Sequence, residues 1–226
     1  MGSVIGDILP LAIGVALSPV PIIAVILMLF SKNARSTSLT FLIGWFLGVA
    51  VVAVIIFLLA DPAQQSTGGE ASPLAAIVRI VLGLLLLYLA YRDWQKRPKP
   101  GEQAEMPKWM SSIDSMTSGK ALGLGALLSG VNPKNLALII AAGVVISGAG
   151  LNATQTIIAL VVFVVLACVS VAAPVLLYLI LGDKAAATLN SWKMWLTQNN
   201  TTVMMLLCLV FGIVLLGKGL GVLIGG

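Results

Sequence analysis

Residues 121–146 read ALGLGALLSGVNPKNLALIIAAGVVI, an apolar run with one charged residue, Lys134, near its centre. A bilayer core of about 30 Å needs roughly 20 apolar helical residues, so the run is long enough to cross a membrane. The pair Asn132-Pro133 falls inside the run, where a proline removes a backbone hydrogen bond and interrupts a helix. Together with five similar runs it predicts six transmembrane helices, at about residues 8–31, 39–60, 74–91, 121–146, 156–181 and 202–216.

The composition agrees with a membrane protein. Of the 226 residues, 59% are hydrophobic and 9% are charged, and the mean hydropathy is +1.09. A soluble domain carries about a quarter charged residues, so a water-soluble enzyme, a nucleic-acid-binding domain and a disordered chain are excluded. Because the chain has no histidine, we expect no His-centred metal site, catalytic triad or proton relay. We also expect no cofactor. We expect one all-α integral membrane domain over residues 1–226.

Lysine and arginine are unevenly distributed over the predicted loops. The first, third and fifth loops carry ten of the 13 basic residues, and the second and fourth loops carry none. Since cytoplasmic loops are enriched in Lys and Arg, the odd loops are predicted to face the cytoplasm and both termini the outside. The ten residues are Lys32, Arg35, Arg92, Lys96, Arg97, Lys99, Lys108, Lys120, Lys184 and Lys193.

The long basic loop, at about residues 95–118, divides the six helices into two halves of three, about residues 1–95 and 119–226. An odd number of helices in each half makes the second half enter the membrane from the opposite side, as in transporters built from inverted repeats. The first helix of each half carries a similar interruption, LSPVP at residues 17–21 and LSGVNP at residues 128–133. The sequence therefore predicts two inverted three-helix repeats.

The two interruptions mark the expected binding site. Carbonyl groups freed by a proline cannot turn to water in hydrocarbon, so a broken helix survives only where protein or a hydrated cavity covers the break. One proline kink is common in membrane helices, but matched breaks in corresponding helices favour a substrate site near the midplane. The candidate residues are Ser18, Pro19, Pro21, Ser129, Asn132, Pro133, Lys134 and Asn135.

Lys134 is the costliest of these residues to place in a membrane. A lysine at the helix centre costs roughly 2.5–3.5 kcal/mol even on insertion scales. The sequence offers no Asp or Glu at comparable depth, so the expected partners are carbonyls freed by the prolines, the amides of Asn132 and Asn135, or an anionic substrate group. Two roles are open for Lys134: substrate binding or gating, and a structural tie between the broken helices.

Other features favour packing or membrane contact. Gly44 and Gly48 permit close helix packing, either within the chain or across a homodimer. The third and fifth loops each carry an amphipathic patch, which we expect to lie as a helix in the headgroup region, with a protein docking surface as the alternative. The patches consist of Trp109, Met110, Ile113 and Met116, and of Leu189, Trp192, Trp195 and Leu196.

Several kinds of membrane protein fit poorly. A redox carrier of this plan would need cysteines beside the breaks, where Ser18 and Ser129 stand instead. The sequence contains no Walker loop, which argues against ATP-driven transport by this chain alone. An embedded enzyme is also disfavoured, because no acid–base pair converges at one depth.

The pattern resembles a known family. The two interruptions, with NPKN at residues 132–135, resemble the LysE superfamily of exporters, and the stretch from about residue 109 to 143 is more specifically similar to the glycolipid-addressing (GAP, Sap-like) family of mycobacteria and related actinobacteria. The resemblance implies a bacterial inner-membrane protein that helps move cell-envelope glycolipids towards the surface. Unlike the metal exporters of that superfamily, this sequence lacks intramembrane acidic ligands, which argues against cation transport and against a bound metal.

The sequence thus predicts export or transbilayer transfer of an envelope lipid, with Lys134 meeting an anionic or polar headgroup. The first alternative is a small-solute exporter for amino acids or anions, and the second is a non-transporting accessory protein of a lipid-export complex. The expected partners are membrane lipids and, in the second case, a larger export machinery, but no nucleic acid.

Overall fold

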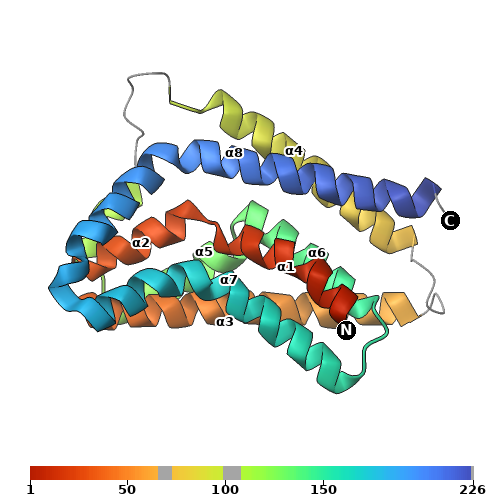
Figure 1. Cartoon of the computed structure of the whole chain (residues 1–226), viewed down its shortest axis with the longest axis horizontal. Helices are drawn as coiled ribbons and strands as arrows, with labels where there is room; N and C mark the ends of the chain where they lie inside the picture. Colours follow the sequence, from red (N-terminus) through yellow and green to blue (C-terminus); the bar gives the residue numbers. More distant parts are fainter. Residues whose placement is uncertain (66–72, 99–107, 225–226) are drawn as a thin grey trace.

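The computed structural model describes residues 1–65, 73–98 and 108–224, and all regular structure within these ranges is helical (Figure 1). The all-α prediction is therefore confirmed for the described part of the chain. The α-helices are α1 (Gly2–Ala16), α2 (Pro19–Leu29), α3 (Ala34–Gln65), α4 (Pro73–Gln95), α5 (Ser118–Gly130), α6 (Pro133–Ser147), α7 (Ala153–Leu181) and α8 (Ala186–Ile224). Two short 3-10 helices, η1 (Lys108–Ser115) and η2 (Gly182–Ala185), precede α5 and α8.

Two pairs of helices are bent at the predicted interruptions. The axes of α1 and α2 differ in direction by 52°, and those of α5 and α6 by 64°. Pro10 and Pro174 lie inside α1 and α7 without ending them, so a proline alone does not break these helices. The breaks occur where prolines coincide with a second helix-disfavouring feature, a further proline in one case and Gly130 and Asn132 in the other.

The described helices provide three candidate membrane spans by length and composition, or five if each bent pair counts as one span. The three are Ala34–Ala60, Pro73–Gln95 and Ala153–Ile224. The sequence predicts six spans. The part of the chain that the structure describes gives at most five candidate spans because α7, η2 and α8 follow one another without a gap and count as one helical run of 72 residues.

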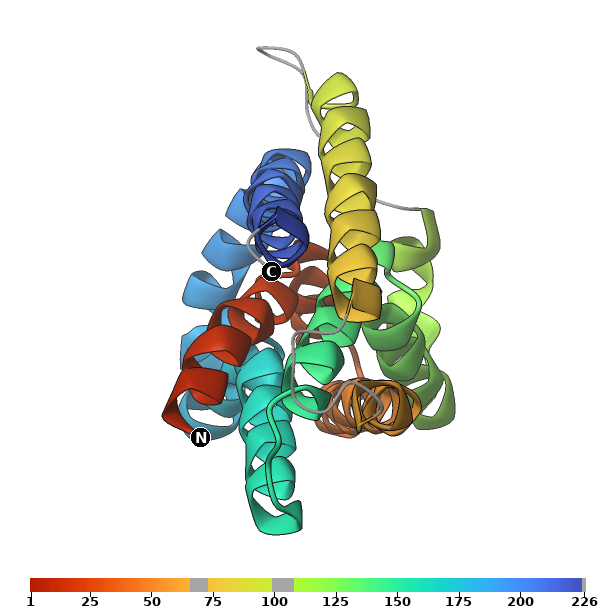
Figure 2. The ribbon, with the colours of Figure 1, turned by 90° about the vertical axis from the view of Figure 1, so that its right-hand side faces the viewer.

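α1, α2 and α6 lie between two groups of helices, whereas α5 lies at the edge of the molecule against α3 (Figures 1 and 2). α4 and α8 pack along each other on one side, and α3 and α7 lie on the other side. α1, α2 and α6 contact members of both groups, and Ser18 and Lys134 at the two breaks are buried, whereas Val131 at the second break is exposed. The outer faces of α3 and α7 are apolar and exposed, as expected for surfaces that meet lipid.

α3 and α5 approach each other closely because glycines lie at their contact. A Cβ atom at Gly44 would collide with the carbonyl oxygen of Leu122, and one at Gly48 with Oγ of Ser129. On the facing helix, a Cβ atom at Gly125 would collide with the carbonyl oxygen of Phe41. The spacing of Gly44 and Gly48 thus serves packing within the chain, the first of the two predicted uses.

The two amphipathic patches are more firmly packed than the sequence indicates. Met110 and Ile113 of η1 are buried in the core, and η1 contacts α2. In the second patch Leu189 is buried, whereas Trp192 and Trp195 are exposed. This patch is the first part of α8 and not a separate helix, and α8 changes direction after it (Figure 1). Both segments thus place apolar side chains in the core, and their position in the headgroup region stays a prediction.

An ion pair joins α1 to α8 near the chain ends. Nζ of Lys218 lies 2.6 Å from Oδ1 of Asp7, and both side chains are almost half exposed. Exposed pairs contribute little, so Lys218→Ala is expected to lower the stability by less than about 1 kcal/mol. Thermal unfolding in detergent measures this. A much larger loss would mean that the pair holds α1 against α8.

Candidate functional site at the two helix breaks

The first break consists of Leu17 and Ser18, between α1 and α2. Pro19 and Pro21 have no N–H group, so the carbonyls four residues earlier, those of Val15 and Leu17, lose their helical donors. Ser18 adopts an extended backbone, with φ −108° and ψ 104°, and ends the helical path of α1. The two prolines therefore expose carbonyl oxygens at the end of α1, inside the protein.

Every carbonyl in this last turn of α1 has a replacement donor. The carbonyl of Val15 accepts from Oγ of Ser18 at 2.8 Å. The carbonyl of Ala16 accepts from the backbone N–H of Ser18 at 2.7 Å and also from the hydroxyl of Ser170, on α7. The carbonyls of Gly14 and Leu17 accept from Lys134. A protein donor thus lies within hydrogen-bond distance of each of these carbonyls, as burial in a membrane requires.

The second break lies between α5 and α6. Asn132 caps α6 with its side chain, whose Oδ1 accepts from the backbone N–H of Lys134 at 3.0 Å. Pro133 occupies the first position of α6, where a missing N–H costs nothing. The side chain of Asn135 donates back to the carbonyl of Leu128, in the last part of α5, at 3.4 Å. The sequence Asn-Pro at this point therefore restarts a helix in a new direction.

Lys134 connects the two breaks. Its ammonium donates to the carbonyl oxygens of Gly14 at 2.6 Å and Leu17 at 3.3 Å, and to Oγ of Ser18 at 2.9 Å. These three acceptors match the three N–H donors of an ammonium group. The side chain is 1% exposed, and the ion pairs among the described residues, Arg92–Asp93 and Lys218–Asp7, do not include it. The negative end of the α1 dipole stabilises the buried cation in place of a carboxylate.

Ser18 and Asn135 complete this polar cluster. Oγ of Ser18 lies 2.8 Å from the carbonyl oxygen of Val15 and 2.9 Å from Oδ1 of Asn135, and its single proton can serve one of these acceptors at a time. Both side chains are buried, as is Lys134. The hydroxyl of Ser18 can therefore donate either to Val15 or to Asn135.

The predicted site residues divide into two groups. Ser18, Lys134 and Asn135 are brought together, and Pro19, Pro21 and Pro133 shape the breaks around them. Asn132 and Ser129 stand apart from the ammonium. Asn132 caps α6, and the buried Ser129 donates to the carbonyl of Ala126 at 2.9 Å beside α3.

The sequence reasoning missed Ser170 and the role of Gly14. Ser170 is the one serine in the uncharged run of the fifth predicted helix, which is the only signal it gave. A Cβ atom at Gly14 would lie 2.6 Å from the ring of Phe211 and 2.8 Å from Leu138, so a larger residue there would require these side chains to shift. The carbonyl of Gly14 accepts from Nζ of Lys134. In the described ranges, no group of three or more Cys, Asp, Glu or His side chains could hold a metal.

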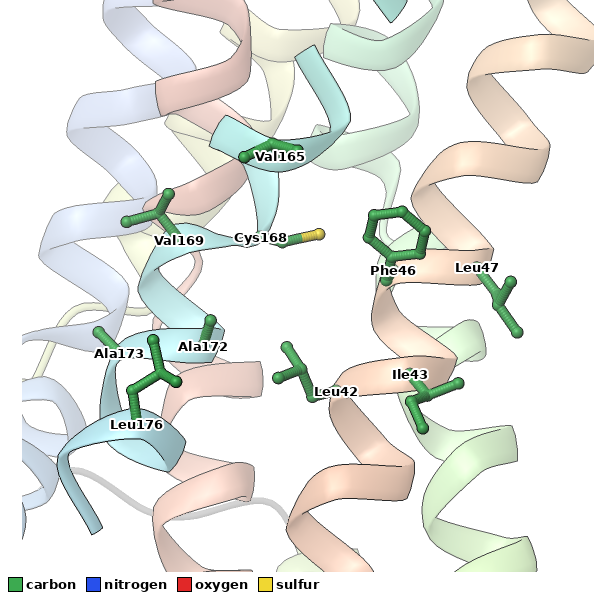
Figure 3. A pocket seen from close by; sticks show the side chains of 10 residues that line it. All are labelled: Leu42, Ile43, Phe46, Leu47, Val165, Cys168, Val169, Ala172, Ala173 and Leu176. Carbon is green, nitrogen blue, oxygen red and sulfur yellow. The ribbon is translucent and has the colours of Figure 1, made fainter. Parts of the chain in front are cut away.

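An apolar groove lies between α3 and α7 (Figure 3). Its volume is about 550 Å³, and side chains from both helices point into it. A volume of this size is typical of sites for small organic ligands. The lining contains hydrocarbon and one thiol, from Leu42, Ile43, Phe46, Leu47, Val165, Cys168, Val169, Ala172, Ala173 and Leu176.

These features define a class of protein: an all-helical membrane protein with a polar cluster between two broken helices and an apolar groove on its flank. The family model described as Sap, sulfolipid-1-addressing protein, matches residues 8–221, and the chain belongs to this family. The predicted Sap-like resemblance is thus confirmed. Neither the curated proteins nor the solved structures compared with the chain include a match.

Proposed function

We propose that the protein transfers cell-envelope glycolipids across the bacterial inner membrane, at a site formed by its two helix breaks. The observation that carries the proposal is the reach of Lys134 from the second break into the first, where its ammonium is buried. A buried cation at membrane depth is a functional-site hypothesis by default. The family description adds the substrate class, because it names a sulfolipid, whose sulfo group is anionic.

The lengths of the helices support six membrane crossings. The run α7–η2–α8 has 72 residues, and at 1.5 Å per residue it would extend for about 108 Å, more than three times the bilayer core. Gly182, with φ +56°, interrupts the run and separates one crossing by α7 from another by α8. If each bent pair makes one crossing, the total is six. With the basic loops in the cytoplasm, both termini then lie outside.

The helix contacts support two inverted repeats. In this scheme α3 corresponds to α7, α4 to α8, and the α1–α2 pair to the α5–α6 pair. α3 packs on α5 and α6, and α7 packs on α1 and α2, so each helix contacts the broken pair of the other half. Likewise α2 contacts α8, and α6 contacts α4. A pseudo-two-fold axis that relates the two halves would place each helix against the broken pair of the other half in this way.

Transport at this site requires the release of Lys134. Its three donors are used by α1 and Ser18, so a headgroup oxygen can bind only by displacing one of these acceptors. Anionic oxygens form stronger hydrogen bonds with an ammonium than carbonyls do. Binding of the headgroup therefore loosens the tie between α1 and α6, which couples substrate binding to a change of access.

The groove between α3 and α7 favours a lipid over a small solute. A LysE-type small-solute exporter needs a compact polar cavity closed to lipid, whereas lipid transfer needs an apolar groove that opens between helices. The described groove is of the second kind. A non-transporting accessory protein would depend on η1 and the first part of α8 for docking, and not on Lys134.

Reconstitution tests the proposal. Purified protein is placed in liposomes that contain a trace of fluorescent anionic glycolipid, with and without a proton gradient, and a membrane-impermeant quencher is added outside. We expect quenching to proceed beyond the outer-leaflet half of the label, because lipid from the inner leaflet becomes accessible. Efflux of labelled amino acids from the same liposomes without lipid transfer would favour the small-solute exporter. Activity in neither assay would favour the accessory protein.

A further inference from the structure

The groove between α3 and α7 has the dimensions of one lipid chain in one leaflet. On α7 it extends from Val165 to Leu176, which is about 16 Å at 1.5 Å per residue. Half of a bilayer core is about 15 Å thick. Ile43, Phe46 and Leu47 on one wall remain exposed, so the groove is open along its side to the surroundings of the protein. A chain could enter it laterally from the membrane.

The depth of the groove places it in one half of the membrane. α3 begins at Ala34 and α7 ends at Leu181, and these ends lie together at one end of the molecule (Figure 1). Leu42 lies eight residues from the start of α3, and Leu176 five residues from the end of α7, so the groove begins within about 12 Å of that end. This end carries the basic first and fifth loops, which the charge distribution assigns to the cytoplasm.

Two exposed basic residues, one of them next to Asp183, lie at the ends of α3 and α7 nearest the groove. Arg35 stands in the first turn of α3, about 10 Å along the helix from Leu42, and Lys184 lies in η2, directly after α7. Both side chains are exposed. A cation at the end of an apolar groove attracts an anionic headgroup. The groove therefore offers apolar surface for a chain and positive charge for the group that carries it.

We propose that this groove binds an acyl chain of an anionic lipid from the cytoplasmic leaflet, with the headgroup held by Arg35 and Lys184. The proposal rests on the proposed function for its orientation in the membrane and assigns the groove as the entry site for the lipid. The chain occupies the space between Leu42 and Ala172, while the headgroup stays at the membrane surface. Entry of the headgroup towards Lys134 is then the second step.

Photo-crosslinking in vesicles tests this site. The full chain is reconstituted in vesicles that contain phosphatidylglycerol or phosphatidylcholine with the same diazirine-bearing acyl chain, and adducts are located by mass spectrometry. We expect adducts concentrated on residues 42–47 and 165–176, with more from phosphatidylglycerol than from phosphatidylcholine. Adducts spread evenly over exposed apolar residues such as Leu58 and Ile77, with no excess in the groove, would overturn the proposal.

Two groove-filling variants and one matched control sharpen the result. Ala172→Phe on α7 and Leu42→Phe on α3 each fill part of the groove. Each should lower the labelling of the groove by about fivefold, which is the effect expected if the new ring keeps little more than one methylene group of the acyl chain out of the groove. Val161→Phe adds the same ring to an exposed position of α7 outside the groove and should leave the labelling unchanged. Equal labelling in all three variants would contradict the site.

The headgroup contact has its own readout. The double variant Arg35→Gln, Lys184→Gln should retain groove labelling but lose the preference for phosphatidylglycerol. A retained preference would overturn the assignment of the headgroup site. Labelling of the groove in protein that moves no lipid would support this inference while contradicting the proposed transfer, whereas transfer without groove labelling would contradict this inference alone.

Discussion

Lys134→Met is expected to lower lipid transfer by roughly 10- to 100-fold in the liposome assay, because it removes charge-assisted hydrogen bonds worth about 1.5–3 kcal/mol to the bound headgroup. Methionine retains much of the length and apolar stem of lysine but offers no donor. In the described arrangement the same substitution frees the carbonyls of Gly14 and Leu17 and removes a buried charge. These two effects on stability oppose each other, so we expect a folded protein with a strong defect in transfer.

Lys218→Met is the control for this variant, because Lys218 is exposed and lies far from the breaks in sequence. This substitution should leave transfer unchanged. Unaltered transfer by Lys134→Met would remove Lys134 from the mechanism and leave it a structural tie. The dependence on lipid concentration separates two contributions. A lost headgroup contact raises the lipid concentration needed for half-maximal transfer, whereas a lost tie between α1 and α6 changes the maximal rate.

The sequence predicted the parts of this site that depend on local chemistry. Prolines at residues 19, 21 and 133 locate the breaks, since a missing N–H interrupts a helix wherever it lies. The high cost of Lys134 in a membrane predicted a polar partner, with freed carbonyls, the amides of Asn132 and Asn135, or an anionic substrate group as the candidates. The carbonyls of Gly14 and Leu17 are among its acceptors. The partners of Lys134 could be narrowed from the sequence because few kinds of group satisfy a buried ammonium.

The rest depends on which helices become neighbours, which hydrophobicity alone does not determine. Ser170 reaches the carbonyl of Ala16 only because α7 packs on α1. The groove lies between α3 and α7, and its residues are ordinary apolar side chains in the sequence. Likewise, Met110 and Ile113 form part of the core through the contact of η1 with α2, although their spacing also fits a helix at the membrane surface.

The contact of α3 with α5 leads to a paired prediction on one helix. A Cβ atom at Gly125 would collide with the carbonyl oxygen of Phe41 and lie 2.8 Å from the backbone N of Trp45, whereas one at Gly123 has no atom within 4 Å. Gly125→Ala must therefore push α3 away from α5, because backbone atoms cannot rotate aside as a side chain can. Overpacking of this kind costs about 3 kcal/mol, which corresponds to a thermal midpoint lower by roughly 6–12 °C.

Gly123→Ala makes the same chemical change two residues earlier on α5 and should leave the midpoint unchanged or raise it slightly, since alanine favours a helix by up to about 1 kcal/mol over glycine. Thermal unfolding of both variants in the same detergent, followed by tryptophan fluorescence, measures the difference. Because both variants gain the same helix propensity, the gap between their midpoints reports the collision with α3. Equal midpoints would mean that α5 does not pack against α3 at the described distance, and the position of Ser129 beside Gly48 would then be wrong as well.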